Sequence, residues 1–144
     1  MTASGNRLIS SICYMDAPAA IKWLEQAFGF RPHLVVPGEN GEIMHSQLIA
    51  EDGCSMIMLF SARTEDFYAQ MRPPQVLNGG SNQSLYLVVE DVDAYYQRAM
   101  DAGATSLLPP TDQDYGGSCC TVADPEGHVW SFGSYDPWAE TEAE

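Results

Sequence analysis

Basic residues are scarce in this chain. Its 144 residues include six Lys and Arg against 20 Asp and Glu, which gives a formal net charge of −14. A surface this acidic repels both the phosphate backbone of nucleic acids and anionic lipid headgroups. We therefore expect neither nucleic acid nor a membrane surface as a partner.

Long apolar runs and paired cysteine motifs are also lacking. No segment approaches the roughly 18 apolar residues of a membrane span, and the opening MTASGNRLIS has no apolar stretch behind a basic start, so we expect no signal peptide. The four cysteines form no CxxC motif, and Cys119 and Cys120 are adjacent. Such spacing fits neither a disulfide framework nor a zinc knuckle. We predict a reduced, cytoplasmic protein.

What the chain does contain is an internal repeat. Apolar residues make up 45% of it, enough for the core of one ordinary domain. Three landmarks recur in both halves: a helix-opening Asp, a helix-ending Gly and a hairpin Gly. They pair as Asp16 with Asp91, 75 residues apart, and as Gly29 with Gly103 and Gly53 with Gly127, each 74 apart. The agreement predicts a duplicated module; the alternative is chance similarity between two amphipathic helices.

Each half of the repeat has the same predicted order of elements. A strand-like run ends at the Asp, which can cap a helix, and three further strand-like pieces follow the helix-ending Gly. These pieces are 33–37, 43–50 and 55–61 in the first half and 105–109, 118–123 and 128–134 in the second. The prediction is an α+β fold of two βαβββ modules within a single domain. Its parts are module one at about 7–61, a linker at about 62–83, module two at about 84–136 and an acidic tail at 137–144.

Three motifs within this pattern resemble those of the vicinal oxygen chelate superfamily. They are D-x-x-x-A near the first helix, FGF at its end, and DPEGHVWSF in the last hairpin. That superfamily includes glyoxalase I, extradiol dioxygenases, and the fosfomycin and bleomycin resistance proteins. The resemblance covers about residues 7 to 136. It implies two modules whose mixed sheets curl around a shared cavity, often in a homodimer.

The resemblance also implies where a metal would bind. In metal-using members a His commonly lies seven residues before the helix-opening Asp, and a Glu four residues after the hairpin Gly. The corresponding positions here are Ile9, Ile57, Ser84 and Ser131. None supplies the imidazole or carboxylate that a divalent ion requires. We therefore expect no metal and no other cofactor.

Strand alternation indicates which side chains face the cavity. If Ser131 faces inward, Trp130 and Phe132 face the helix; in IMHSQL, Met44 and Leu48 suit the helix layer. The candidate ligand-binding residues are then His45, Gln47, Ser84, Tyr86, Cys13, Tyr115, Cys119, Thr121 and Ser131. For several of them an ordinary alternative stays open: a backbone-satisfied strand histidine at His45, a plain buried thiol at Cys119, and an exposed loop tyrosine at Tyr115.

These residues predict a protein that holds a small organic molecule in a metal-free cavity, similar to the drug-sequestering, bleomycin resistance-type members of the superfamily. The alternative is a metal-dependent, glyoxalase-like lyase or isomerase with non-standard ligands such as His45. A third possibility is a structural or interaction protein with a filled cavity. The sequence assigns no catalytic residue. Because strand edges and apolar faces need covering, we also expect a homodimer.

Overall fold

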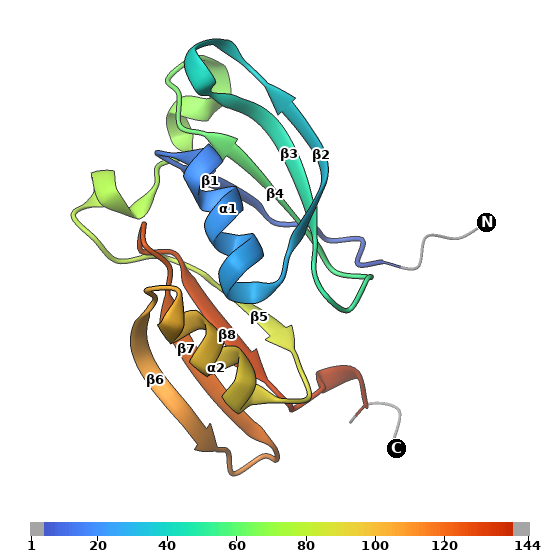
Figure 1. The fold of residues 1–144 in the computed structure, drawn as a ribbon. Helices are drawn as coiled ribbons and strands as arrows, with labels where there is room; N and C mark the ends of the chain where they lie inside the picture. Colours follow the sequence, from blue (N-terminus) through green and yellow to red (C-terminus); the bar gives the residue numbers. More distant parts are fainter. Residues whose placement is uncertain (1–4, 140–144) are drawn as a thin grey trace. The chain divides into compact units, whose positions relative to one another are not determined.

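The chain folds into two compact units, Met1–Gly79 (unit 1) and Gly80–Glu144 (unit 2). Figure 1 shows the computed structural model, which describes residues 5–139. Each unit contains a long α-helix and a four-stranded mixed sheet. This is the α+β class with repeated βαβββ modules that the sequence predicts. Each sheet has two edge strands and neither closes into a barrel. Residues 140–144 of the acidic tail lie outside the described part of the chain.

Unit 1 has its strands in the order β1-β4-β3-β2. Strands β1 and β4 are parallel, and the other two pairings are antiparallel. The elements are β1 (Ser11–Tyr14), α1 (Ala17–Phe28), β2 (Arg31–Pro37), β3 (Ile43–Ile49) and β4 (Met56–Ser61). Three short 3₁₀ helices accompany them: η1 (Glu39–Gly41), η2 (Asp66–Gln70) and η3 (Pro74–Leu77).

Unit 2 repeats this topology, with its strands in the order β5-β8-β7-β6. Again the first pair is parallel and the other two are antiparallel. Its elements are β5 (Ser84–Val88), α2 (Val92–Asp101), β6 (Thr105–Asp112), β7 (Ser118–Ala123) and β8 (Val129–Gly133). Among the described residues, no helix of either unit is long and apolar enough to cross a bilayer.

The helix boundaries follow from the capping residues. A carboxylate oxygen of Asp16 accepts a hydrogen bond from the Ala19 amide at 3.1 Å, and Asp91 does the same for Ala94 at 3.0 Å. Both bonds satisfy a free N–H of the first helical turn. Helix α1 then ends at Gly29, whose φ of 76° is the left-handed conformation that glycine adopts without a steric penalty. Asp16, Asp91 and Gly29 therefore mark helix boundaries. Helix α2 differs at its end, because it is capped by Ala102, one residue before Gly103.

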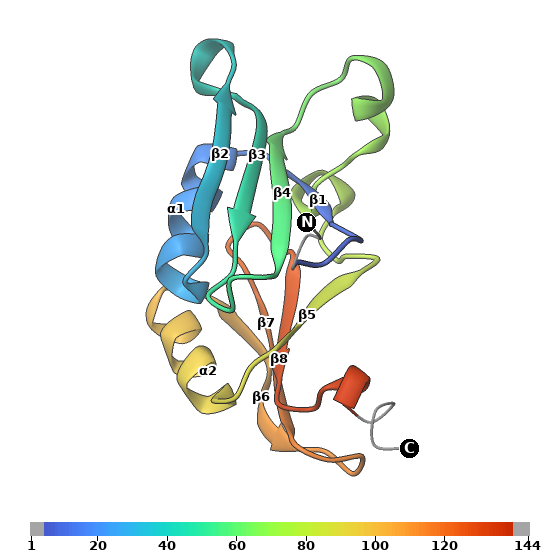
Figure 2. The ribbon, with the colours of Figure 1, turned by 90° about the vertical axis from the view of Figure 1, so that its right-hand side faces the viewer.

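Each helix lies along one face of its own sheet, as Figure 2 shows. The strand residues that face it form the core: Leu48 and Leu59 in unit 1, and Trp130 and Phe132 in unit 2, are at most 2% exposed. The ring of Phe132 stacks on Tyr95 of α2, with centroids 5.1 Å apart. The predicted helix-facing orientation of Trp130 and Phe132 is thus confirmed.

Met44 departs from the prediction. It is 41% exposed and not part of the helix layer. It lies at the start of β3, where the pairing with β2 shifts register between Val36 and Pro37. There it contacts Arg63, whose guanidinium donates to the Met44 carbonyl at 3.2 Å. Strict alternation fails here because the register shift changes the surroundings of the strand end.

The hairpin between β7 and β8 is built around a buried carboxylate. Asp124 is 4% exposed and accepts hydrogen bonds from the backbone amides of Glu126 and His128, each at 3.0 Å. Its other oxygen accepts from the indole N–H of Trp130 at 3.1 Å. The DPEG turn is therefore tied to the largest side chain in the core of unit 2, and this fixes the register of β8.

Candidate functional site

In unit 2, the sheet face opposite α2 carries a row of hydroxyl groups. Tyr86, Ser131 and Thr121 pair in register across β5, β8 and β7, so their side chains share one face. The hydroxyls of Thr121 and Ser131 are hydrogen-bonded at 2.7 Å. Ser84 and Cys119 lie on the same face, because each is two residues along its strand from a member of this row, Tyr86 and Thr121 respectively. The structure therefore brings these five predicted residues together on one surface.

Tyr86 is held across this face by its phenol. Its hydroxyl donates to the backbone carbonyl of Tyr135 at 2.7 Å, and its ring occupies the space that a side chain at Gly133 would fill. Tyr115 packs edge-on against Tyr135, with ring centroids 4.9 Å apart. The pKa of the Tyr86 phenol is raised chiefly by burial, and to a smaller extent by the neighbouring Cys119 and Tyr115. Tyr86 is therefore a neutral hydrogen-bonding phenol at physiological pH.

In unit 1, the predicted pair His45 and Gln47 lies on β3. Their side chains are hydrogen-bonded through the Gln47 amide nitrogen and His45 Nε2 at 3.0 Å. Their register partners on β2, Val36 and Leu34, are 41% and 44% exposed. This face therefore offers one polar pair within an accessible apolar surface. The remaining predicted residue, Cys13, pairs with Phe60 and is only 4% exposed.

The residues at the family's metal positions do not fit a metal. Ile57 is buried in the core, and the Ser131 hydroxyl is engaged with Thr121. Neither an imidazole nor a carboxylate is present at Ile57, Ser84 or Ser131. Within residues 5–139, no three His, Cys, Asp or Glu side chains are grouped so that they could hold an ion. The donor set therefore gives no basis for a metal-dependent step.

The buried Cys120 thiol of unit 2 is not activated. All four cysteines of the chain are free, and Cys120 is fully buried. Burial raises the pKa of the Cys120 thiol to about 11. The thiol of Cys119 lies 3.6 Å from the carbonyl oxygen of Cys120. A reactive cysteine needs a lowered pKa near a cation or a helix N-terminus, and no such arrangement supports catalysis at Cys120.

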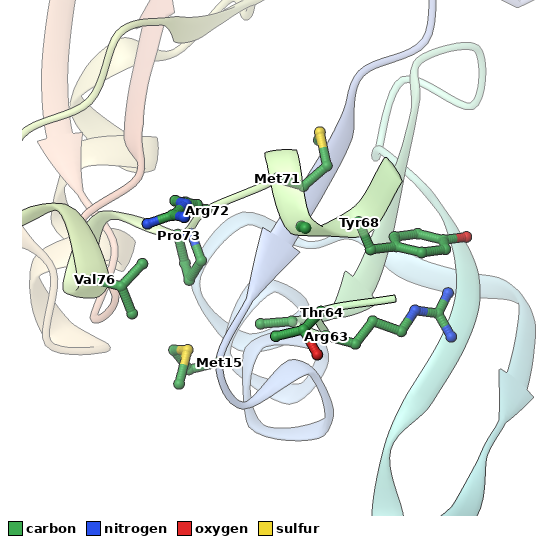
Figure 3. Close-up of a pocket in the computed structure, with 10 residues that line it drawn as sticks. Met15, Arg63, Thr64, Tyr68, Met71, Arg72, Pro73 and Val76 are labelled. Atoms are coloured by element: carbon green, nitrogen blue, oxygen red, sulfur yellow. The ribbon is translucent and has the colours of Figure 1, made fainter. Parts of the chain in front are cut away.

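Sequence reasoning missed a pocket of about 390 Å³ in unit 1. Figure 3 shows it between the turn after β1 and the segment that follows β4, which the sequence predicts to be a linker. Its lining comprises Met15, Ala62, Arg63, Thr64, Tyr68, Ala69, Met71, Arg72, Pro73 and Val76. The available signal was the apolar and aromatic content of 67–76, which is unusual for a solvated linker.

Two aromatic contacts hold this segment against the sheet. The ring of Tyr68 meets the ring of Phe60 on β4, with centroids 5.2 Å apart. The guanidinium carbon of Arg63 lies over the Tyr68 ring, 3.8 Å from the ring centroid. Such a cation–π contact is attractive and orients both side chains. Tyr68 therefore anchors helix η2 to the sheet, and this also fixes the part of the pocket wall that η2 forms.

Comparisons with known proteins agree with this architecture. The family model described as the Glyoxalase/Bleomycin resistance protein/Dioxygenase superfamily matches residues 8–132. An uncharacterized protein of Mycobacterium tuberculosis, Rv0887c, is 36% identical over 122 residues, which cover 82% of this chain and 68% of the relative.

Solved structures with the same fold span most of the chain. TioX from Micromonospora sp. ML1 is 29% identical with a TM-score of 0.65, covering 90% of this chain and 98% of its own. A glyoxalase/bleomycin resistance protein from Streptomyces sp. CB03234 is 22% identical with a TM-score of 0.66, covering 87% and 96% respectively. The chain belongs to the glyoxalase/bleomycin resistance protein/dioxygenase superfamily.

Proposed function

We propose that this protein binds a small organic molecule on the helix-free faces of its sheets, without a metal, in the manner of the drug-sequestering members of its superfamily. The observation that carries the proposal is the row of Tyr86, Ser131 and Thr121. In this row a serine paired to a threonine hydroxyl occupies a position where metal-using relatives place a carboxylate. The row offers neutral hydrogen-bonding groups to a ligand in place of a Lewis acid.

The groups on these faces define what kind of ligand they suit. His45, Gln47 and the hydroxyl row can donate or accept hydrogen bonds, while Leu34 and Val36 supply accessible apolar contacts. Binding sites for small molecules commonly combine a mostly apolar lining with a few placed polar groups. Cys13, Ser84, Cys119 and Tyr115 complete the proposed set, with Tyr115 contributing a loop side chain that is 58% exposed.

The first test is metal retention. We expect the purified protein, incubated with excess Zn²⁺, Ni²⁺, Mn²⁺ or Fe²⁺ and then dialysed, to keep no stoichiometric metal, because neutral hydroxyls and aliphatic side chains are poor ligands. The matched control is the Ser84→His/Ser131→Glu variant, which adds family-type donors within unit 2 and should retain more metal than the natural chain. Metal analysis by mass spectrometry measures both.

Stoichiometric metal in the natural chain would instead favour the glyoxalase-like alternative. In that case conversion of the hemithioacetal of methylglyoxal and glutathione should be measurable and should be abolished by a chelator. Absence of both metal and turnover supports the metal-free proposal.

We further propose a cytoplasmic homodimer. Four free thiols fit a reducing compartment, and the edge strand β2, exposed along its whole length, is a surface that a second copy could cover. Sedimentation equilibrium at micromolar concentration should give twice the chain mass of 15.8 kDa. A single species at the chain mass would contradict the dimer.

A further inference from the structure

We propose that the pocket of unit 1 shown in Figure 3 binds an organic anion with an apolar body, and that Arg72 supplies the charge that recognises it. The pocket is formed by residues of unit 1 alone, between the turn after β1 and the segment 62–76. Its lining shares no residue with the hydroxyl row or with the His45–Gln47 pair. The inference therefore stands or falls independently of the function proposed above.

The size and walls of the pocket fit a small molecule. Its volume of about 390 Å³ lies within the range typical of ligand sites. Figure 3 shows Met15 and Val76 facing Thr64 and the aliphatic part of Arg63 across it. The two methionines of the wall, Met15 and Met71, are flexible and polarisable, so they can adapt to an apolar body of irregular shape. The walls favour burial of an aryl or alkyl group.

The sign of charge at the pocket is opposite to that of the chain as a whole. Two of the six basic residues, Arg63 and Arg72, line it, and none of the described lining residues is an Asp or a Glu. In a chain with 20 acidic residues, a lining that carries only positive charge raises the local concentration of anions relative to cations. The charge of the lining itself therefore favours a negatively charged ligand over a cation.

The two arginines have different roles. The guanidinium of Arg63 is directed away from the pocket, over Tyr68 and onto the carbonyl of Met44, so that Arg63 holds the wall in place. Its Nε is buried and has no hydrogen-bond partner among residues 5–139, which leaves one unused donor beside the pocket. Arg72, in contrast, is exposed and forms no ion pair or hydrogen bond within the described residues.

Arg72 is therefore the group available to a ligand. The hydroxyl of Thr64, which lines the pocket and likewise has no hydrogen-bond partner in the described chain, can add a neutral donor. A carboxylate or sulfonate attached to an aromatic body matches this pairing of an apolar wall with a guanidinium at the rim.

The location of binding can be tested with anilinonaphthalene sulfonate, an aromatic anion whose fluorescence rises in apolar sites. The protein is labelled with ¹³C at its methionine methyl groups, of which the chain has seven. We expect the signals of Met15 and Met71 to shift on titration, while Met56 and Met58, which lie on β4 in the sheet, stay unchanged. Shifts confined to Met56 and Met58 would overturn the proposal and would point to the sheet face instead.

The role of Arg72 is tested with two matched pairs of variants. Arg72→Gln should weaken the sulfonate about tenfold, whereas Arg31→Gln, which removes the same charge from exposed β2, should leave its affinity unchanged. Val76→Ser should weaken binding several-fold, whereas Leu77→Ser should not, because Leu77 is equally exposed but does not line the pocket.

A neutral apolar dye, Nile red, completes the test and should bind the Arg72→Gln variant as well as it binds the natural protein. Circular dichroism establishes that each variant is folded. Equal affinities of the sulfonate for Arg72→Gln and Arg31→Gln would overturn the assignment of Arg72. Equal affinities for Val76→Ser and Leu77→Ser would overturn the assignment of the pocket.

Discussion

Alanine at Asp124 should lower the free energy of unfolding by about 3–5 kcal/mol. The carboxylate accepts hydrogen bonds from the amides of Glu126 and His128 and from the indole of Trp130, at 3.0–3.1 Å. Asp124 is 4% exposed, so water cannot readily replace these bonds. Truncation would leave three donors without this acceptor and would release the β7–β8 turn. Urea denaturation followed by tryptophan fluorescence measures the loss.

The corresponding hairpin of unit 1 provides the control. Asp52 accepts from the amides of Cys54 and Ser55, each at 2.8 Å, and from the Ser55 hydroxyl, but its side chain is exposed. Water can therefore take over these bonds, and Asp52→Ala should cost only about 1 kcal/mol. Equal losses in the two variants would contradict the role given to burial at Asp124.

The Asp52 control also carries a pH signature. Burial alone would raise the pKa of this carboxyl, but the hydrogen bonds from Ser55 and Cys54 together outweigh burial and lower the pKa below its ordinary value of 3.8. A lowered pKa in the folded state stabilises the protein above the ordinary pKa, and this contribution is lost as the pH falls through the folded-state pKa. The deficit of Asp52→Ala should therefore shrink in strongly acidic solution.

Phe132→Ala and Tyr86→Ala should have very different effects although the two residues lie on neighbouring strands. Phe132 is fully buried and stacks on Tyr95 of α2, so its truncation should cost about 3–5 kcal/mol of the free energy of unfolding. Tyr86 lies on the opposite face and is 42% exposed. Its truncation should cost about 1 kcal/mol, chiefly through loss of the hydrogen bond to the Tyr135 carbonyl.

Urea titration of both variants measures the difference. A cost at Tyr86 as large as that at Phe132 would show that the helix-free face is a structural core, which is what the third possibility, a structural protein with a filled cavity, requires. A small loss of unfolding free energy in Tyr86→Ala would show that the helix-free face is not a structural core, as a ligand-binding surface requires.

The fold was predictable because its signals are local. Asp16, Asp91 and Gly29 set helix boundaries through backbone hydrogen bonds and φ angles, and two-residue alternation placed Trp130 and Phe132 against α2. Alternation predicts the facing of these strand residues well because a helix buries one face of each sheet, so the apolar side chains must lie on that face. The comparison of Ile57, Ser84 and Ser131 with the metal ligands of related proteins came from the family resemblance. The hydrophobic pattern of the chain contains no information about metal ligands.

The features that could not be predicted from the sequence depend on contacts between residues far apart in the chain. The position of Met44 follows from a register shift and from Arg63, 19 residues further along the chain. Most of the wall of the pocket in unit 1 comes from the segment 62–76, which has no repeating pattern and is held in place by the contacts of Tyr68 with Phe60 and Arg63. The DPEG motif indicates a hairpin, but the hydrogen bond from the Trp130 indole to the Asp124 carboxylate forms only in the folded hairpin.

Ligand binding at the hydroxyl row is the central claim. A double variant, Thr121→Val/Ser131→Ala, removes both partners of the 2.7 Å hydrogen bond together, so that no buried group loses its partner. The fold should therefore tolerate the change while the binding surface loses its polar groups.

The most direct measurement is a thermal-shift screen of a small-molecule library in excess EDTA, run on the natural protein and on this double variant. We expect at least one compound to raise the melting temperature of the natural protein in proportion to occupancy, and to raise that of the variant much less. If no compound stabilises the natural protein in EDTA, or if the two proteins respond equally, the hydroxyl row is not the ligand-binding site proposed here.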